Sequence, residues 1–203
     1  IKHVRQESAS DGWFSRSRSL LADREEHTRA EEKGTRWIPI EELALKIQEN
    51  HPPADGLFSA YRNAMEAARK FVSEKKLVSF PPSEVLRVVP TPEFQRHEIP
   101  FAAYLSPSPK DPEQAGYYYV TPATEDDLLK EHNWTGLENT SVHESYPGHH
   151  LQFTIANSIP QASTLPRLMN ESSVFYEGWA LYCEQLMQEQ GFLVAIQEHV
   201  MQA

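Results

Sequence analysis

The chain has 203 residues, a length that fits one domain, or one domain with a subdomain, and that can bury a real core. Hydrophobic residues make up 39% of the sequence and aromatic residues 10%, which is ordinary for a globular protein. The formal net charge of −10 argues against a general nucleic-acid binder, which needs a basic face, but it allows a local cation site.

The cysteine content and the length of the apolar runs further limit the class of protein. Cys183 is the only cysteine, so we expect no intrachain disulfide, and any metal site must use histidines and carboxylates. No apolar run approaches the roughly 20 residues that span a bilayer. Because the chain begins at Ile1 without a signal pattern and ends inside a helical pattern, we expect a fragment of a longer protein, and the compartment cannot be read.

The first half of the chain predicts helices. Residues 1–35 are charged and weakly periodic, which is typical of a solvated helix or a linker. Pro39 stands at a first-turn position and predicts a helix over 41–47. A second helix is predicted over 57–76, where apolar residues recur along one face.

The period then changes to short apolar segments bounded by prolines. These predict strands at 77–80, 85–89, 101–105 and 117–120. The last is the clearest, and the prolines in the loop before it favour an edge strand. A capping-box pattern then opens a short helix over 124–130.

From Leu137 the pattern is helical almost to the end, with interruptions at 159–166 and at Gly191. The sequence therefore predicts a mainly helical α+β fold. We divide it into a helical N-terminal part, 1–76, and a part that carries the chemistry, 77–203, which together form one compact unit.

The informative motif begins at His143-Glu144. Metalloproteases of the H-E-x-x-H type place two histidines four residues apart, so that both rings reach one zinc, and the glutamate acts as general base. In this chain Pro147 stands where the second histidine is expected, and histidines follow at 149 and 150.

Helix geometry decides how these histidines could share an ion. Six residues of straight helix separate His143 and His149 by about 9 Å and place them on different faces. Pro147 disrupts a regular helix, because it lacks an N–H and clashes with the carbonyl of His143. If Pro147 and Gly148 are extruded as a bulge, His149 takes the place of the missing ligand.

Two other interpretations of the motif stay open. The helix could end at Tyr146, with a Pro-Gly turn and two surface histidines. Alternatively, His150 rather than His149 could be the second ligand.

A third ligand is expected from the segment 175–184. Glu177 lies on a second helix, 28 residues after His149, among aromatic and apolar neighbours that indicate a largely buried helix. The ordinary alternative is a solvent-facing glutamate. Glu184, two turns further along, is a candidate to orient a ligand or to replace one.

The two motifs, 143–152 and 177–182, resemble the bacterial domain-of-unknown-function family 885 over roughly residues 85–190. That family is similar to the gluzincin metallopeptidases. The resemblance implies zinc at His143, His149 and Glu177, with Glu144 as base, and a zincin-like fold of metal-binding helices beside a small sheet. It also implies that the chain is the C-terminal portion of a larger, mostly helical protein. Gluzincins often carry an acidic residue four positions after the ligand glutamate, but this chain has Leu181 there.

The function expected is zinc-dependent hydrolysis of a peptide or small amide, with metal-activated water and Glu144 taking the proton. Tyr182 and Tyr146 are candidate donors to the oxyanion. The strand at 117–120 could pair with an extended substrate, although an ordinary core strand is the simpler interpretation.

Two rival functions belong to other classes. A binding module could keep the metal as a structural clip, which a closed set of four ligands would favour. A metal-free helical interaction domain is the other. The substrate, the cleavage mode and the oligomeric state cannot be read from the sequence.

Overall fold

The computed structural model describes residues 40–123, 125–159 and 172–193. The chain divides into two compact units, residues 1–43 and residues 44–203. The charged segment 1–35 and nearly all of the predicted loop at 159–166 lie outside the described residues. The helix predicted at 41–47 is confirmed as α2, Ile40–Glu49.

Helix α3 belongs to the second unit. It spans Leu57–Lys75 after the short 3-10 helix η1, Ala54–Gly56, as its apolar periodicity predicts. The helix ends at Lys76, which adopts the left-handed conformation with φ 54°. The N–H of Leu77 then bonds to the carbonyl of Val72 at 3.1 Å, which satisfies a carbonyl of the last turn.

The strand predicted at 77–80 is wrong. This segment leaves the cap of α3 as turns and irregular backbone. Its apolar residues pack against the core without joining the sheet: Leu77, Val78 and Phe80. An apolar run before prolines predicts burial here, but it does not predict a pairing partner.

Three strands form one mixed sheet. They are β1, Val85–Pro90, β2, Ala102–Leu105, and β3, Ala115–Val120, with the 3-10 helix η2, Glu93–Gln95, after β1. The spatial order is β1-β3-β2, with β1 parallel and β2 antiparallel to β3. The edge position predicted for the strand at 117–120 is therefore wrong, because β3 is central. The prolines before it lie outside the paired residues and leave its hydrogen bonds intact.

The second half of the unit is helical. It contains α4, Asp126–Lys130, α5, Trp134–Glu144, α6, His149–Ser158, and α8, Ser173–Glu189. Helix α5 begins before the predicted residue 137 because the side chain of Asn133 accepts the N–H of Gly136 at 2.8 Å. Thr124, the first residue of the predicted capping box, lies outside the described residues.

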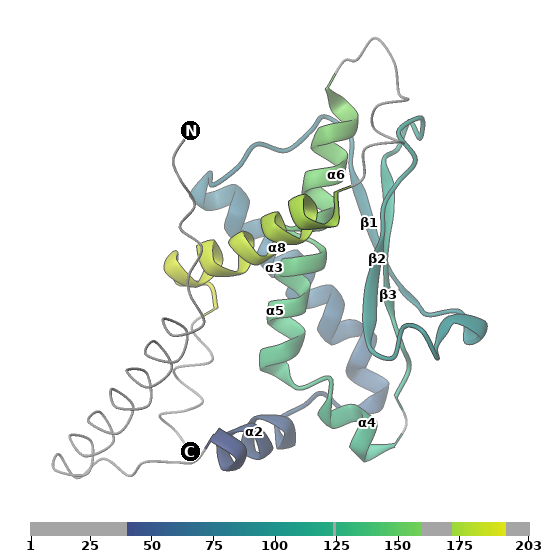
Figure 1. Ribbon diagram of the computed structural model, residues 1–203, viewed down its shortest axis with the longest axis vertical. Helices are drawn as coiled ribbons and strands as arrows, with labels where there is room; N and C mark the ends of the chain where they lie inside the picture. Colours follow the sequence, from purple (N-terminus) through teal and green to yellow (C-terminus); the bar gives the residue numbers. More distant parts are fainter. Residues whose placement is uncertain (1–39, 124, 160–171, 194–203) are drawn as a thin grey trace, which may run out of the picture. The chain divides into compact units, whose positions relative to one another are not determined.

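Within this unit the helices pack on one side of the sheet, and α8 crosses α5 and α6 (Figure 1). Tyr118 and Val120 of β3 are fully buried and contribute to a core cluster with α3. A second cluster joins α3 to α5, α6 and α8: Met65, Ala68, Val72, Val142, Tyr146, Leu151, Cys183, Met187 and Leu193. The mainly helical α+β fold is confirmed.

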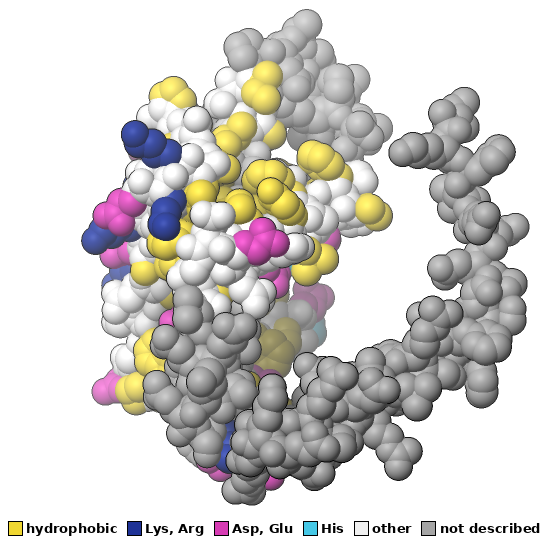
Figure 2. All heavy atoms as spheres, turned by 90° about the vertical axis from the view of Figure 1, so that its left-hand side faces the viewer, with side chains coloured by type: hydrophobic (Ala, Val, Ile, Leu, Met, Phe, Trp, Pro, Cys, Tyr) yellow, Lys and Arg dark blue, Asp and Glu magenta, His cyan; other side chains and the backbone are white. Residues whose placement is uncertain are grey.

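The surface carries both signs of charge. On the face drawn in Figure 2, the Lys and Arg side chains of the described residues are few and separate, and acidic and apolar side chains lie among them. Within the described ranges, no helix is both long and apolar enough to cross a membrane.

Candidate metal centre

The backbone between the two histidines breaks as the sequence predicts. Helix α5 ends at Glu144 and α6 begins at His149. The Tyr146–Pro147 peptide bond is cis, and Gly148 has φ −69° and ψ −136°, outside helical angles. The N–H of Gly148 bonds to the carbonyl of Val142 at 3.2 Å, six residues back, so a widened turn joins the two helices.

Gly148 is required at this turn for steric reasons. A Cβ added there would overlap the carbonyl oxygens of His143 and Val142. Only a residue without a side chain allows the backbone of the turn to lie this close to the end of α5.

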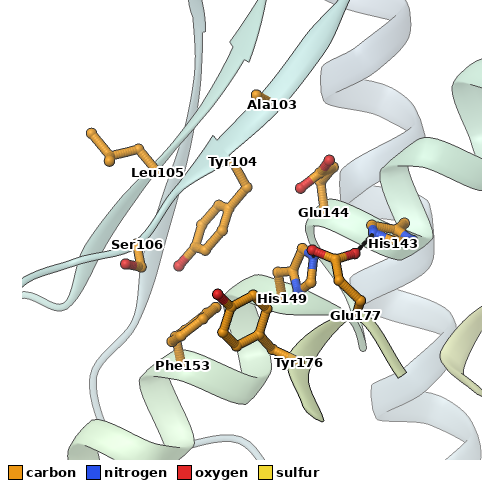
Figure 3. A pocket seen from close by; sticks show the side chains of 10 residues that line it. All are labelled: Ala103, Tyr104, Leu105, Ser106, His143, Glu144, His149, Phe153, Tyr176 and Glu177. Carbon is orange, nitrogen blue, oxygen red and sulfur yellow. Dashed lines mark ion pairs between the residues drawn. The ribbon is translucent and has the colours of Figure 1, made fainter. Parts of the chain in front are cut away.

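The turn brings the predicted ligands together. His143, His149 and Glu177 each offer an atom within 4.8 Å of those of the other two. His143 Nε2 lies 3.3 Å from Glu177 Oε2, and His149 Nε2 lies 3.6 Å from Glu177 Oε1. The two imidazole rings are perpendicular, with 4.7 Å between their centroids, and Glu177 faces both (Figure 3).

The outer nitrogens of the two rings point away from Glu177. His143 Nδ1 lies 2.6 Å from Glu184 Oε1. His149 Nδ1 is buried and lacks a hydrogen-bond partner among the described residues, as does Oε1 of Gln152 on the same helix. Burial, followed by the proximity of His143, lowers the pKa of His149, which favours the neutral imidazole that metals bind.

This donor set fits zinc. Two imidazole nitrogens and one carboxylate are ligands that Zn²⁺ takes, and a fourth tetrahedral position is left for water or substrate. The separations within 4.8 Å need only a small contraction of side chains around an ion with bonds of roughly 2 Å.

Glu144 lies beside this cluster in a cleft of about 370 Å³. Burial raises the pKa of Glu144 to about 7, near the value that suits a group exchanging protons at neutral pH. The other residues that line the cleft come from β2 and its end, α5, α6 and α8: Ala103, Tyr104, Leu105, Ser106, His143, His149, Phe153, Tyr176 and Glu177.

Two expectations about helix α8 need correction. Its predicted burial is wrong, because only the face with Ala180, Cys183 and Met187 is buried, and the Glu177 side chain is 51% exposed. Tyr182 does not line the cleft: it is half exposed and its ring packs against Trp179. Five residues along a helix turn a side chain by roughly 140°, which carries position 182 away from Glu177.

Two other candidates lie behind the cleft: Tyr146, a candidate oxyanion donor, and His150, the alternative second ligand. The hydroxyl of Tyr146 donates to Glu84, so it is not directed at the metal cluster. His150 is fully buried, and its Nε2 lies 2.9 Å from Glu84 Oε2. The sequence did not indicate Glu84, which is 66 residues from His150 and carries no local motif. Tyr104, Phe153 and Tyr176 were also missed.

Hydrogen bonds keep Glu84 charged. Its burial would raise the pKa of the carboxyl, but hydrogen bonds from His150, Tyr146 and Arg69 hold that pKa below its ordinary value. The Arg69 guanidinium lies 2.6 Å from Glu84 Oε1.

Fold and site together define a mainly helical α+β protein that presents two histidines and a glutamate in an open cleft. The sequence matches the family described as "Bacterial protein of unknown function (DUF885)" over residues 23–203, and the chain belongs to this family. Among curated proteins, none matches the chain.

A solved structure with the same fold is similar to this chain. It is the crystal structure of a protein described as a candidate lipoprotein from Colwellia psychrerythraea, with 22% identity and a TM-score of 0.58. The similarity covers 80% of this chain but 28% of the other, so the chain spans little more than a quarter of that protein.

Proposed function

We propose that this protein binds one zinc ion through His143, His149 and Glu177 and hydrolyses peptide or related amide bonds. The observation that carries the proposal is the convergence of two imidazole Nε2 atoms on one carboxylate, at 3.3 and 3.6 Å, in the wall of a cleft.

The residues around the cluster have different roles in the proposed reaction. Glu184 holds His143 so that its Nε2 faces the ion. A bound zinc supplies Lewis acidity, which polarises a carbonyl and lowers the pKa of water. Glu144 accepts a proton from the attacking water and returns it to the leaving nitrogen, a role supported by its place in the cleft and its pKa of about 7.

Strand β2 gives the cleft a surface for an extended peptide. The N–H of Thr121 bonds to the carbonyl of Phe101 across the antiparallel pair of β2 and β3. Hydrogen-bonded residues alternate along such a strand, so the N–H and C=O of Tyr104, three residues after Phe101, face away from β3. That N–H interacts with the Glu144 carboxylate and lowers its pKa. The edge of the sheet at the cleft is therefore β2, and it replaces the predicted strand at 117–120 as the place for substrate pairing.

The rival function is a binding module with a structural metal, and it needs a closed set of four ligands. Among the described residues, His150 pairs with Glu84 and does not join the cluster. This supports the open arrangement that catalysis needs.

The experiment combines metal analysis with a peptide assay. Purified protein is prepared free of chelator, its zinc is measured by elemental analysis, and cleavage of a mixed peptide library is followed by mass spectrometry. We expect one zinc per chain and cleavage that stops in Glu144→Gln. Zinc well below one per chain that added metal does not restore contradicts the proposal, and one zinc without cleavage favours the structural clip.

A further inference from the structure

A chain of buried hydrogen bonds runs behind the cleft and ends on Tyr104. His150 Nε2 lies 2.9 Å from Glu84 Oε2, and His150 Nδ1 lies 3.1 Å from the hydroxyl of Tyr104. The side chains of His150 and Glu84 are 0% and 3% exposed, whereas Tyr104 lines the cleft. The chain therefore connects a buried carboxylate to a phenol that a substrate can reach.

The carboxylate of Glu84 sets the direction of these hydrogen bonds. A carboxylate only accepts, so the nitrogen facing Glu84, Nε2 of His150, carries the hydrogen of the ring. The hydrogen bond at one ring nitrogen fixes the tautomer, so Nδ1 is left as the acceptor and the hydroxyl of Tyr104 donates to it.

Tight packing holds the two rings in this arrangement. Gly116 lies on central strand β3, and a Cβ added there would come within 2.7 Å of His150 Nδ1 and 2.8 Å of the Tyr104 ring. The rings of Tyr104 and His150 meet edge to face, with 5.6 Å between centroids. A glycine at this position leaves the space that the pair needs, so the sheet itself fixes the phenol.

The oxygen of Tyr104 consequently offers lone pairs to the cleft. Its ring lies across the cleft, and the hydroxyl points toward Ser106 and Phe153 (Figure 3). We propose that Tyr104 accepts a hydrogen bond from a backbone N–H of the bound peptide, and that Glu84 and His150 are positioning residues that keep its proton turned away. The inference rests on the proposed function for the class of substrate.

The first test reads the direction of the chain without any variant. Nitrogen-15 NMR of the full chain, with and without zinc, distinguishes the protonation states of the His150 ring. We expect a hydrogen on Nε2 and none on Nδ1. A hydrogen on Nδ1, alone or together with one on Nε2, overturns the proposal, because Tyr104 would then receive the hydrogen bond and could donate into the cleft.

The second test uses capped tripeptides in which one backbone amide at a time is replaced by an ester. Binding to the zinc-loaded protein is measured by calorimetry for the wild type and for Tyr104→Phe. At one position the ester should bind the wild type about five-fold more weakly than the amide, as for one lost hydrogen bond, and this preference should vanish in Tyr104→Phe.

A matched control and a turnover assay separate the outcomes. Tyr176→Phe removes a phenol hydroxyl from the same cleft and should keep the preference, while zinc content and unfolding should match across all three proteins. An unchanged preference in Tyr104→Phe, no preference at any position, or no binding overturns the proposal. Selective binding without cleavage would instead refute hydrolysis and leave the acceptor role standing.

Discussion

The carboxylate of Glu184 holds the imidazole of His143, with 2.6 Å between Oε1 and Nδ1. Glu184 follows Glu177 by seven residues, two turns of α8, so both carboxylates project from one side of the helix and take opposite nitrogens of the same ring. Asn139 donates to the other oxygen of Glu184 at 2.7 Å. The pairing with Glu184 places the hydrogen of His143 on Nδ1 and leaves Nε2 for an ion.

Removing the charge of Glu184 should weaken zinc binding although no proposed ligand is lost. In Glu184→Gln we expect the zinc affinity to fall about 10- to 100-fold, because the partner that orients His143 is neutral. Competition with a chromophoric chelator measures the change. Glu189→Gln, an exposed substitution on the same helix whose partner is Gln185, should bind zinc as the wild type does; equal losses in both variants would contradict this role.

The two carboxylates of the cleft should differ in what they support. Glu144→Gln should keep zinc and the fold while hydrolysis falls at least about 100-fold, because only the proton acceptor is removed. Glu177→Gln should weaken zinc binding itself. Zinc content, circular dichroism and peptide cleavage are compared for both variants, and an equal loss of zinc would show that the roles are not divided in this way.

The parts of the site that could be predicted depend on local chemistry. Pro147 breaks a helix wherever it stands in the interior, so the interruption after His143 follows from the sequence and is confirmed as the gap between α5 and α6. The bulge at Pro147 and Gly148 also predicted that His149 approaches His143, whereas Glu177 was predicted from the segment 175–184 and the family resemblance; the structure brings the three side chains together. Whether they bind zinc stays a prediction.

The parts that could not be predicted depend on contacts between distant segments. Glu84 and His150 are 66 residues apart, and nothing in either segment indicates the other. The central place of β3 likewise depends on which strands pair with it, which apolar content does not determine. The role of Glu184 depends on how α8 crosses α5, so helical period alone left it as one of two alternatives.

Helix α8 shows a different reason for error. Aromatic and apolar residues on several sides of a helix predict burial, but Phe175 is 71% exposed and Leu181 59% exposed in this chain. Composition reports how much apolar surface a helix carries, and the packing partners decide how much of it is covered.

Two glycine substitutions should change stability in opposite directions. Gly148→Ala should lower the free energy of unfolding by about 3 kcal/mol, because its Cβ overlaps backbone carbonyls that cannot move without distorting α5. Gly178→Ala should raise it by about 0.5–1 kcal/mol, because the position is exposed within α8 and a Cβ meets nothing within 4 Å. Denaturant unfolding of both variants measures the difference. Similar effects of the two substitutions would contradict the geometry of the turn.

A buried histidine outside the metal cluster, His132, should make the fold sensitive to acid. His132 is 1% exposed, its Nδ1 lies 2.8 Å from the hydroxyl of Tyr61, and burial lowers its pKa from 6.5. Well above pH 6.5 the ring is neutral in both the folded and the unfolded state, so it adds no pH dependence. As the pH falls below 6.5, His132 is protonated in the unfolded chain but stays neutral in the folded chain. The free energy of unfolding therefore decreases, by at most about 1.4 kcal/mol per pH unit.

His132→Gln keeps a hydrogen-bond acceptor for Tyr61 but cannot titrate, so it should remove this part of the pH dependence. We expect urea unfolding between pH 7.5 and pH 5.5 to show a smaller loss of stability in His132→Gln than in the wild type, whatever the offset at pH 7.5. His97→Gln serves as the control, because it removes an imidazole whose side chain is 74% exposed. If the wild type and His132→Gln lose stability in parallel as the pH falls, then burial of His132 does not oppose its protonation in the folded chain, and the acid sensitivity must come from other groups.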